Sequence, residues 1–167
     1  NNKLYGAAIY SGRFYILDVS DKSNPYTILS HSTGGSGTHD CAVTYDENYL
    51  ITADETTGGN VKIWDIQDFN NINMISQWTV DGGEDKSIHN VLVRDQYLYI
   101  SYYIFGLQIL DISDPSNPSE IASYESTNHI DAVAVLDSNY IAIGDRDGKI
   151  TFLDVTDFQN IDILKTV

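Results

Sequence analysis

The sequence has a single cysteine, few basic residues and no long apolar run. Cys41 is the sole cysteine of the 167 residues, so the chain can form no disulfide with itself. Nine lysines and arginines stand against 24 acidic residues, for a formal net charge of −15. This balance argues against nucleic acid and anionic membrane surfaces as partners, because both attract clustered basic residues. No stretch approaches the ~20 apolar residues of a membrane-spanning helix, so we expect no direct membrane insertion.

The composition is otherwise that of a folded globular protein. Hydrophobic residues make up 42% of the chain, and the aromatic residues are led by twelve tyrosines. A chain of this length typically forms one domain with one core, so we expect residues 1–167 to fold as a single unit. The acidic excess fits either a heavily hydrated surface or a calcium-rich exterior medium, and the sequence leaves both open.

One phrase occurs four times and predicts the fold. In each copy, an aspartate follows an apolar run and is followed by one apolar residue, one further residue and a second aspartate; the copies are residues 15–21, 62–68, 108–114 and 151–157. The first aspartates of the four copies are Asp18, Asp65, Asp111 and Asp154, with spacings of 47, 46 and 43 residues. A period of about 45 residues is typical of the blades of a β-propeller. We interpret these four aspartates as scaffold residues, because a carboxylate that ends a strand can accept backbone N–H groups of the following turn.

Four short strands surround each phrase. In the third copy they are His89–Val93, Tyr97–Tyr102, Leu107–Ile112 and Glu120–Tyr124. The second copy gives 42–45, 49–53, 61–66 and 74–78, and the fourth gives 132–136, 140–143, 150–155 and 163–167. No segment carries a sustained apolar period of 3.6 residues, so no helix is predicted.

These patterns predict an all-β protein, a β-propeller with about four blades of four antiparallel strands. The expected repeats are approximately 1–38, 39–83, 88–126 and 129–167, and the first begins near Leu4 with what reads as a second strand. A closed ring of four blades is one possibility. The sequence favours a partial ring from a seven-bladed propeller, because seven blades of this length need roughly 315 residues.

Two kinds of segment resemble known families. Residues 16–25 and 109–118 are similar to the leucine-valine-isoleucine-valine-aspartate (LVIVD) repeat. The longer segments 38–55 and 89–103 resemble the choice-of-anchor B family. That resemblance implies a seven-bladed propeller in an exported bacterial protein, secreted or displayed at the cell surface.

Candidate metal ligands fall in two places. Three histidines stand near the starts of first strands, His39 beside Asp40, His89 beside Asn90 and His129 two residues before Asp131. First strands line the channel of a propeller, so these residues can gather there and hold a metal, or form a polar network between blades. The glycine-rich loops 54–60, with Asp54 and Glu55, and 81–85 offer oxygen ligands for calcium, or are solvated hairpin tips.

Tyr102, Tyr103 and Phe105 form the remaining candidate site. As an aromatic patch at a hairpin tip they can stack on a sugar or a peptide, or else pack between blades. The sequence contains no recognisable catalytic motif. We therefore expect a non-catalytic extracellular or cell-surface module for binding or display, which interacts with a protein or a glycan. The alternatives are a metal-dependent enzyme that uses His39, His89 and His129, and a subunit of a larger surface assembly.

Overall fold

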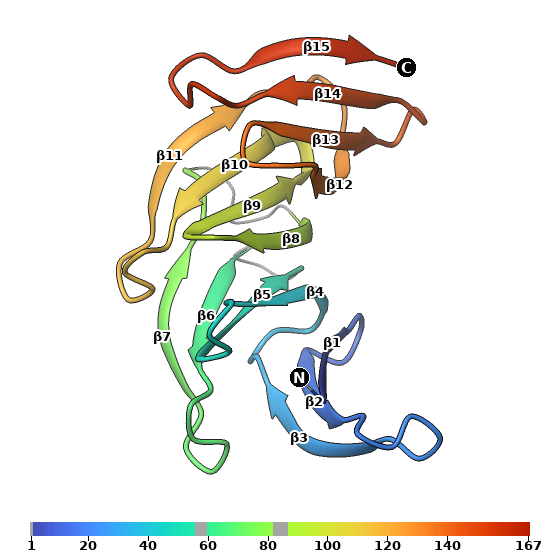
Figure 1. Ribbon diagram of the computed structural model, residues 1–167, viewed down its shortest axis with the longest axis vertical. Helices are drawn as coiled ribbons and strands as arrows, with labels where there is room; N and C mark the ends of the chain where they lie inside the picture. The colour runs from blue at the N-terminus through green and yellow to red at the C-terminus, as the bar shows by residue number, and fades with distance from the viewer. Residues whose placement is uncertain (1, 56–59, 82–86) are drawn as a thin grey trace.

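The computed structural model describes residues 2–55, 60–81 and 87–167 and contains four antiparallel sheets (Figure 1). Blade 1 is β1 (Lys3–Ala8), β2 (Arg13–Asp18) and β3 (Tyr26–Ser32), which correspond to the second, third and fourth strands of the other blades. Blade 2 is β4 (Thr38–Val43), β5 (Tyr49–Asp54), β6 (Val61–Asp65) and β7 (Asn73–Trp78). Blade 3 is β8 (Ile88–Arg94), β9 (Tyr97–Tyr102), β10 (Gly106–Asp111) and β11 (Ser119–Tyr124), with a single 3-10 turn, η1 (Tyr103–Phe105), between β9 and β10. Blade 4 is β12 (Ile130–Val135), β13 (Tyr140–Asp145), β14 (Ile150–Asp154) and β15 (Asp162–Thr166).

The prediction of an all-β propeller with four-stranded repeats is confirmed. Strand limits agree within one or two residues, except that β4 starts at Thr38 where the sequence predicted Ala42. A bulge between Thr38 and Asp40 interrupts the regular alternation there and hides the start of the strand. No helix in the described ranges is long and apolar enough to cross a membrane.

The four sheets follow one another in a curved row. The first strands β4, β8 and β12 lie on its concave side, and the fourth strands β7 and β11 lie on its convex side (Figure 1). Strand β8 contacts both β4 and β12, so neighbouring blades meet along their first strands. The first strands therefore line the concave side of the row, which corresponds to the channel side predicted from the sequence.

Hydrophobic residues pack between consecutive blades. One cluster joins Phe14 and Ile16 of blade 1 to Leu50, Trp64 and Ile66 of blade 2. A second joins blades 2 and 3, and a third joins blades 3 and 4 through Leu107 and Ile109 against Ile141 and Leu153. Each inner blade is covered on both faces, which explains why β5 and β9 are buried at consecutive positions and not only at alternate ones.

The repeated aspartates hold the turn after each third strand. Asp18, Asp65, Asp111 and Asp154 each accept the backbone N–H of the residue two positions ahead, at 2.7–3.0 Å. A second aspartate three residues on repeats the bond to its own turn, at Asp21, Asp68, Asp114 and Asp157. Each repeat therefore contains two carboxylates that accept a backbone N–H of their own turn.

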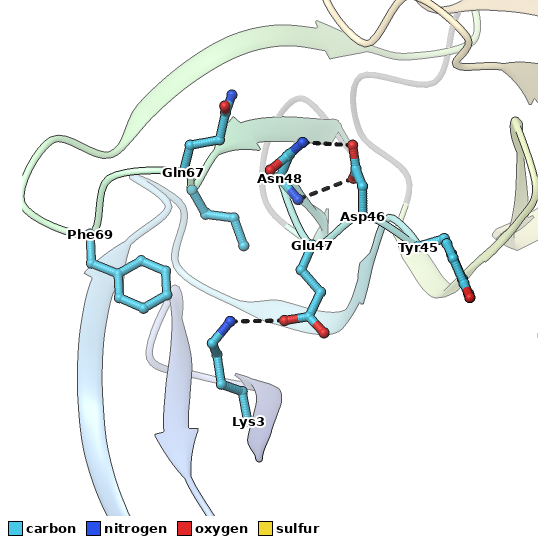
Figure 2. A pocket seen from close by; sticks show the side chains of 8 residues that line it. Lys3, Tyr45, Asp46, Glu47, Asn48, Gln67 and Phe69 are labelled. Atoms are coloured by element: carbon cyan, nitrogen blue, oxygen red, sulfur yellow. Dashed lines mark hydrogen bonds and ion pairs between the residues drawn. The ribbon is translucent and has the colours of Figure 1, made fainter. Parts of the chain in front are cut away.

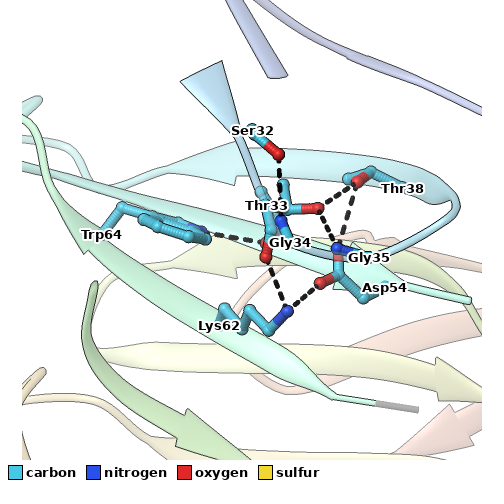
Figure 3. A network of polar contacts seen from close by, with 9 residues as sticks. Ser32, Thr33, Gly34, Gly35, Thr38, Asp54, Lys62 and Trp64 are labelled. Carbon is cyan, nitrogen blue, oxygen red and sulfur yellow. Dashed lines mark hydrogen bonds and ion pairs between the residues drawn. The ribbon is translucent and has the colours of Figure 1, made fainter. Parts of the chain in front are cut away.

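A buried polar network fastens the chain between blades 1 and 2 (Figure 3). Lys62 Nζ donates to Asp54 Oδ2 at 2.5 Å and to the backbone oxygen of Thr33 at 2.8 Å. Thr38 Oγ1 donates to the other oxygen of Asp54 at 3.1 Å and also contacts Thr33 Oγ1. Asp54 is 1% exposed, so its charge is balanced by Lys62 within the protein rather than by water.

We predict that Cys41 is unreactive in the folded protein. Burial raises the pKa of its thiol to about 12, and the neighbouring Asp40 adds to the rise. Since only the thiolate reacts, alkylation by iodoacetamide at pH 8 should be on the order of a thousandfold slower than for a thiol of ordinary pKa. Mass spectrometry over time checks this, with the urea-unfolded protein as the control. Modification at equal rates in both states would contradict it.

Candidate functional site

The strand ends define two opposite faces of the row of blades. At one end, the second strand of each blade begins and the third strand ends on its repeated aspartate, as in the pairing of Tyr49 with Asp65. We call this end the aspartate face. At the other end, first strands begin and second strands end. We call it the histidine face, because it carries His39, His89 and His129.

A bulge at the start of each first strand places one side chain on the histidine face. The pairing of β4 with β5, β8 with β9 and β12 with β13 skips one residue each time. The skipped residues are His39, His89 and Asp131. Bulges redirect side chains and are frequent beside functional sites. These three residues are structural equivalents and form a row from blade 2 to blade 4.

The two imidazoles of this row stack on each other. The rings of His39 and His89 lie 4.8 Å apart and 12° from parallel. His39 Nε2 lies 3.1 Å from Glu55 Oε1. The same nitrogen is buried and makes no hydrogen bond of good geometry, so we regard the contact with Glu55 as an electrostatic one.

Asp131 ends the row and joins a cationic side chain. Its carboxylate lies 2.9 Å from His89 Nδ1 and accepts the Nε–H of Arg146 at 3.0–3.1 Å. The ring of Tyr103 lies 3.9 Å from that of His129, and Arg146 lies 5.9 Å from the Tyr103 ring centre. Tyr103 has a positive φ of 38°, a conformation that bulky residues rarely adopt.

The predicted equivalence of the three histidines needs correction. His129 precedes β12, and the fourth-blade counterpart of His39 and His89 is Asp131. The asparagine and aspartate beside the histidines have a different role, which is to join neighbouring blades. Asp40 Oδ2 accepts the N–H of Val91 at 3.0 Å and the Asn90 amide at 2.5 Å, and Asn90 Oδ1 accepts the N–H of Val133 at 3.0 Å. This is the polar network between blades that the sequence left open as an alternative.

The predicted metal ligands are not gathered in the part of the chain that the structure describes. Residues 2–55, 60–81 and 87–167 contain no group of three or more histidine, cysteine, aspartate or glutamate side chains placed to hold one ion. Asp54 is engaged by Lys62 and Thr38, and Glu55 contacts His39. The rest of both glycine-rich loops, 56–59 and 82–85, lies outside the described residues. Calcium binding there stays a prediction.

The predicted exposed aromatic patch is wrong for Tyr102. This side chain is fully buried, its hydroxyl lies 2.7 Å from Thr79 Oγ1, and its ring contacts Phe105 and Trp78. The physical reason is that a second strand is covered by blades on both sides. Phe105 packs against the same core, so the alternative of aromatics packed between blades holds for this pair. Tyr103 also packs against this core, and its ring contacts His89 and His129 on the histidine face.

We predict that the buried imidazole of His89 makes the protein less stable in mild acid. Burial lowers the pKa of His89, Asp131 partly opposes this, and His39 lowers the pKa further. In the unfolded chain, His89 binds a proton near pH 6.5, whereas in the folded protein it does so only at lower pH. The free energy of unfolding is therefore greatest above pH 6.5 and decreases as the pH falls toward the folded pKa. The urea midpoint should change less between pH 7.5 and pH 5.5 in His89→Asn than in the wild type. An equal change of the urea midpoint in both proteins would contradict the prediction.

The aspartate face carries an exposed aromatic that sequence reasoning missed. Tyr45, in the turn between β4 and β5, is 99% exposed. Three hollows border it, of about 430, 570 and 380 Å³. Figure 2 shows the first, between Lys3 and Phe69, with Tyr45 turned outward from it. The second spans blades 2 and 3 and is lined by Tyr45 and Asp46 on one side and by Asp95, Gln96 and Pro115 on the other.

The turn that carries Tyr45 is held by hydrogen bonds within itself and by hydrogen bonds to blade 1. Thr44 Oγ1 donates to Asp46 Oδ1 at 2.6 Å, and the Asn48 N–H donates to the same oxygen at 3.1 Å. Glu47 accepts Lys3 Nζ at 2.8 Å (Figure 2). It also accepts the Tyr5 hydroxyl at 2.9 Å, and both bonds tie the turn to blade 1. The signal in the sequence was a tyrosine at the head of a polar turn between two apolar strands, where solvent exposure is expected.

The fold and the repeated turn define the class of the protein as a repeat β-propeller. The family model for the LVIVD repeat matches residues 8–33 and 87–126, which include the first and third copies of the phrase. No curated protein matches the chain in the comparison with such proteins.

Solved structures with the same arrangement of blades are distant in sequence. The periplasmic gluconolactonase of Pseudomonas aeruginosa superposes with a TM-score of 0.78 at 8% identity, over 99% of this chain and 51% of that one. A protein from Lactobacillus plantarum gives a TM-score of 0.78 at 14% identity, over 99% and 54%. A computationally designed protein gives 0.73 at 15% identity, over 100% and 46%. The chain thus spans about half the length of these structures, and the likeness shows the fold alone.

Proposed function

We propose that this protein is a non-catalytic binding propeller that recognises a protein or glycan partner through the aspartate face. The observation that carries the proposal is Tyr45, a fully exposed aromatic on a turn fixed by hydrogen bonds and bordered by hollows. Aromatic anchors dominate the binding energy of protein interfaces, and a turn whose backbone is already ordered loses little backbone entropy on binding.

The architecture supports a binding role for this face. The turn of blade 2 and the turns of blade 3 stand side by side around the second hollow, so a ligand there contacts two blades. Turns presented by a rigid scaffold are where binding residues concentrate. The hollows are open and shallow, which suits an extended partner better than a small enclosed substrate.

We further propose that the protein is exported and acts outside the cell or at its surface. The support is the choice-of-anchor B resemblance of residues 38–55 and 89–103, together with the acidic composition. A subunit role in a larger surface assembly is compatible with the same face. The gluconolactonase among the similar structures raises an enzyme as the alternative, but its 8% identity carries no activity over to this chain.

The binding proposal is tested with arrays of glycans and peptides probed by the labelled full-length protein. We expect at least one class of ligand to be retained by the wild type and lost by Tyr45→Ala. Tyr10→Ala is the matched control, because Tyr10 is 89% exposed in the β1–β2 turn at the opposite end of its sheet. Binding that is unchanged in Tyr45→Ala, or lost equally in both variants, would refute the role of the aspartate face.

A further inference from the structure

The aspartate face concentrates negative charge around Tyr45. Each of the four repeats contributes its two turn aspartates to this face, and the turns of the first hairpins add more; the carboxylates are Asp18, Asp21, Asp46, Glu47, Asp65, Asp68, Asp95, Asp111, Asp114, Asp137, Asp154 and Asp157. The basic residues of the same strand ends and turns are few, namely Lys3, Lys22 and Arg94. Such a field attracts cationic partners and repels anionic ones.

Hydrogen bonds within the turns favour the ionised form of four of these carboxylates. Hydrogen bonds from the hydroxyl and backbone of the residue two positions ahead hold the pKa of Asp18, Asp114 and Asp154 below its usual value. The hydroxyl of Thr44 does the same for the pKa of Asp46, beside Tyr45. At these four aspartates, the turn's own hydrogen bonds therefore stabilise the negative charge.

The second hollow combines an aromatic ring with two carboxylates. Tyr45 and Asp46 stand on its blade 2 side, and Asp95 stands on its blade 3 side. Asp95 is exposed and forms a long surface ion pair with Arg94, whose Nε lies 3.8 Å from Asp95 Oδ2. An exposed pair of this kind contributes little free energy, so a partner's cation can replace it. An exposed aromatic face with flanking carboxylates is the arrangement that holds an ammonium or guanidinium group, by cation–π attraction and charge pairing together.

We infer that the hollow between Tyr45 and Asp95 takes a lysine or arginine side chain of a partner polypeptide. The inference rests on the proposed binding function and specifies its ligand. A neutral sugar would use the ring of Tyr45 but would gain nothing from the fixed charges. An acidic glycan would be repelled by them. The volume of about 570 Å³ admits a long basic side chain together with its neighbouring residues.

The test measures binding of a fluorescein-labelled hexa-arginine peptide to the full-length protein by fluorescence anisotropy. The control peptide is hexa-citrulline, which has the same shape without the charge. We expect the arginine peptide to bind at 20 mM NaCl about tenfold more tightly than the citrulline peptide, and 200 mM NaCl to weaken it because the charges are exposed. Neutral oligosaccharides at the same concentrations should not compete.

Matched variants locate the site. Tyr45→Ala should weaken the arginine peptide about fivefold, while Tyr45→Phe retains binding because the ring face is kept. Asp95→Asn should weaken it about threefold, and it preserves the fold because asparagine tolerates the positive φ of 54° found there. Asp162→Asn removes the same charge from exposed β15 of blade 4 and should leave binding unchanged.

The outcomes separate this inference from the binding proposal. If glycans or neutral peptides bind in a Tyr45-dependent way and the arginine peptide does not, the binding function stands and the cationic ligand is wrong. If the arginine peptide binds equally to all variants, its attraction is to the overall charge and the Tyr45 hollow is overturned as its site. If nothing binds through Tyr45, both fail.

Discussion

Lys62→Met is expected to destabilise the protein by about 3–5 kcal/mol. The substitution leaves Asp54 as an unpaired charge that is 1% exposed, and removing one partner of a buried ion pair has costs of this size. It also removes the hydrogen bond from Lys62 Nζ to the Thr33 oxygen, which holds the chain segment between blades 1 and 2 (Figure 3). Urea unfolding followed by circular dichroism measures the loss.

Two further variants show whether the buried charge is the cause. The double variant Asp54→Asn with Lys62→Met keeps an acceptor for the Thr38 hydroxyl but carries no charge, so it should recover at least half of the lost stability. Lys165→Met, on exposed β15, changes the net charge equally and should stay within about 0.5 kcal/mol of the wild type. A double variant as unstable as the single one would show that Lys62 acts through packing.

The fold was predictable from sequence because its signals are local and repeated. Asp18, Asp65, Asp111 and Asp154 mark the same turn in every blade, and the bond from each carboxylate to the turn spans only two residues. Strands flanked by such turns reveal themselves by their spacing. Prediction was therefore good wherever a residue's partner lies within its own repeat.

The candidate sites were less predictable, because they depend on register and on neighbouring blades. His129 looked equivalent to His39 and His89, but the pairing register of β12 places Asp131 at the bulged position, and the spacing of residues in the sequence does not show that register. Tyr102 looked like a hairpin tip, yet the adjoining blade buries it. The exposure of Tyr45 could be expected from its polar turn, but the hollows beside it arise from the relative placement of blades 1, 2 and 3 and leave no signal in the sequence.

Gly106→Ala should strongly destabilise the protein. Gly106 has φ 79° and ψ −143°, a region that is essentially restricted to glycine. An added Cβ would lie 2.0 Å from the backbone oxygen of Tyr124 and 2.9 Å from the Ser126 nitrogen, on the neighbouring strand and its exit. Backbone strain of about 1–3 kcal/mol and a clash with main-chain atoms add together here, so we expect a loss above about 3 kcal/mol.

Two other glycines separate these causes. Gly148 has φ 80° but an added Cβ meets nothing within 4 Å, so Gly148→Ala should cost only the strain, about 1–2 kcal/mol. At Gly6 the φ is not positive and the space is open, so Gly6→Ala should stay within about 0.5 kcal/mol of the wild type. Urea unfolding should show the largest loss of stability for Gly106→Ala, a smaller loss for Gly148→Ala and almost none for Gly6→Ala. If Gly106→Ala lost no more stability than Gly148→Ala, the clash would not be a cause. Because Gly106 directly follows η1, its substitution should also displace Tyr103 from His129, visible as changed His129 ring resonances in NMR at a urea concentration where the variant is still folded.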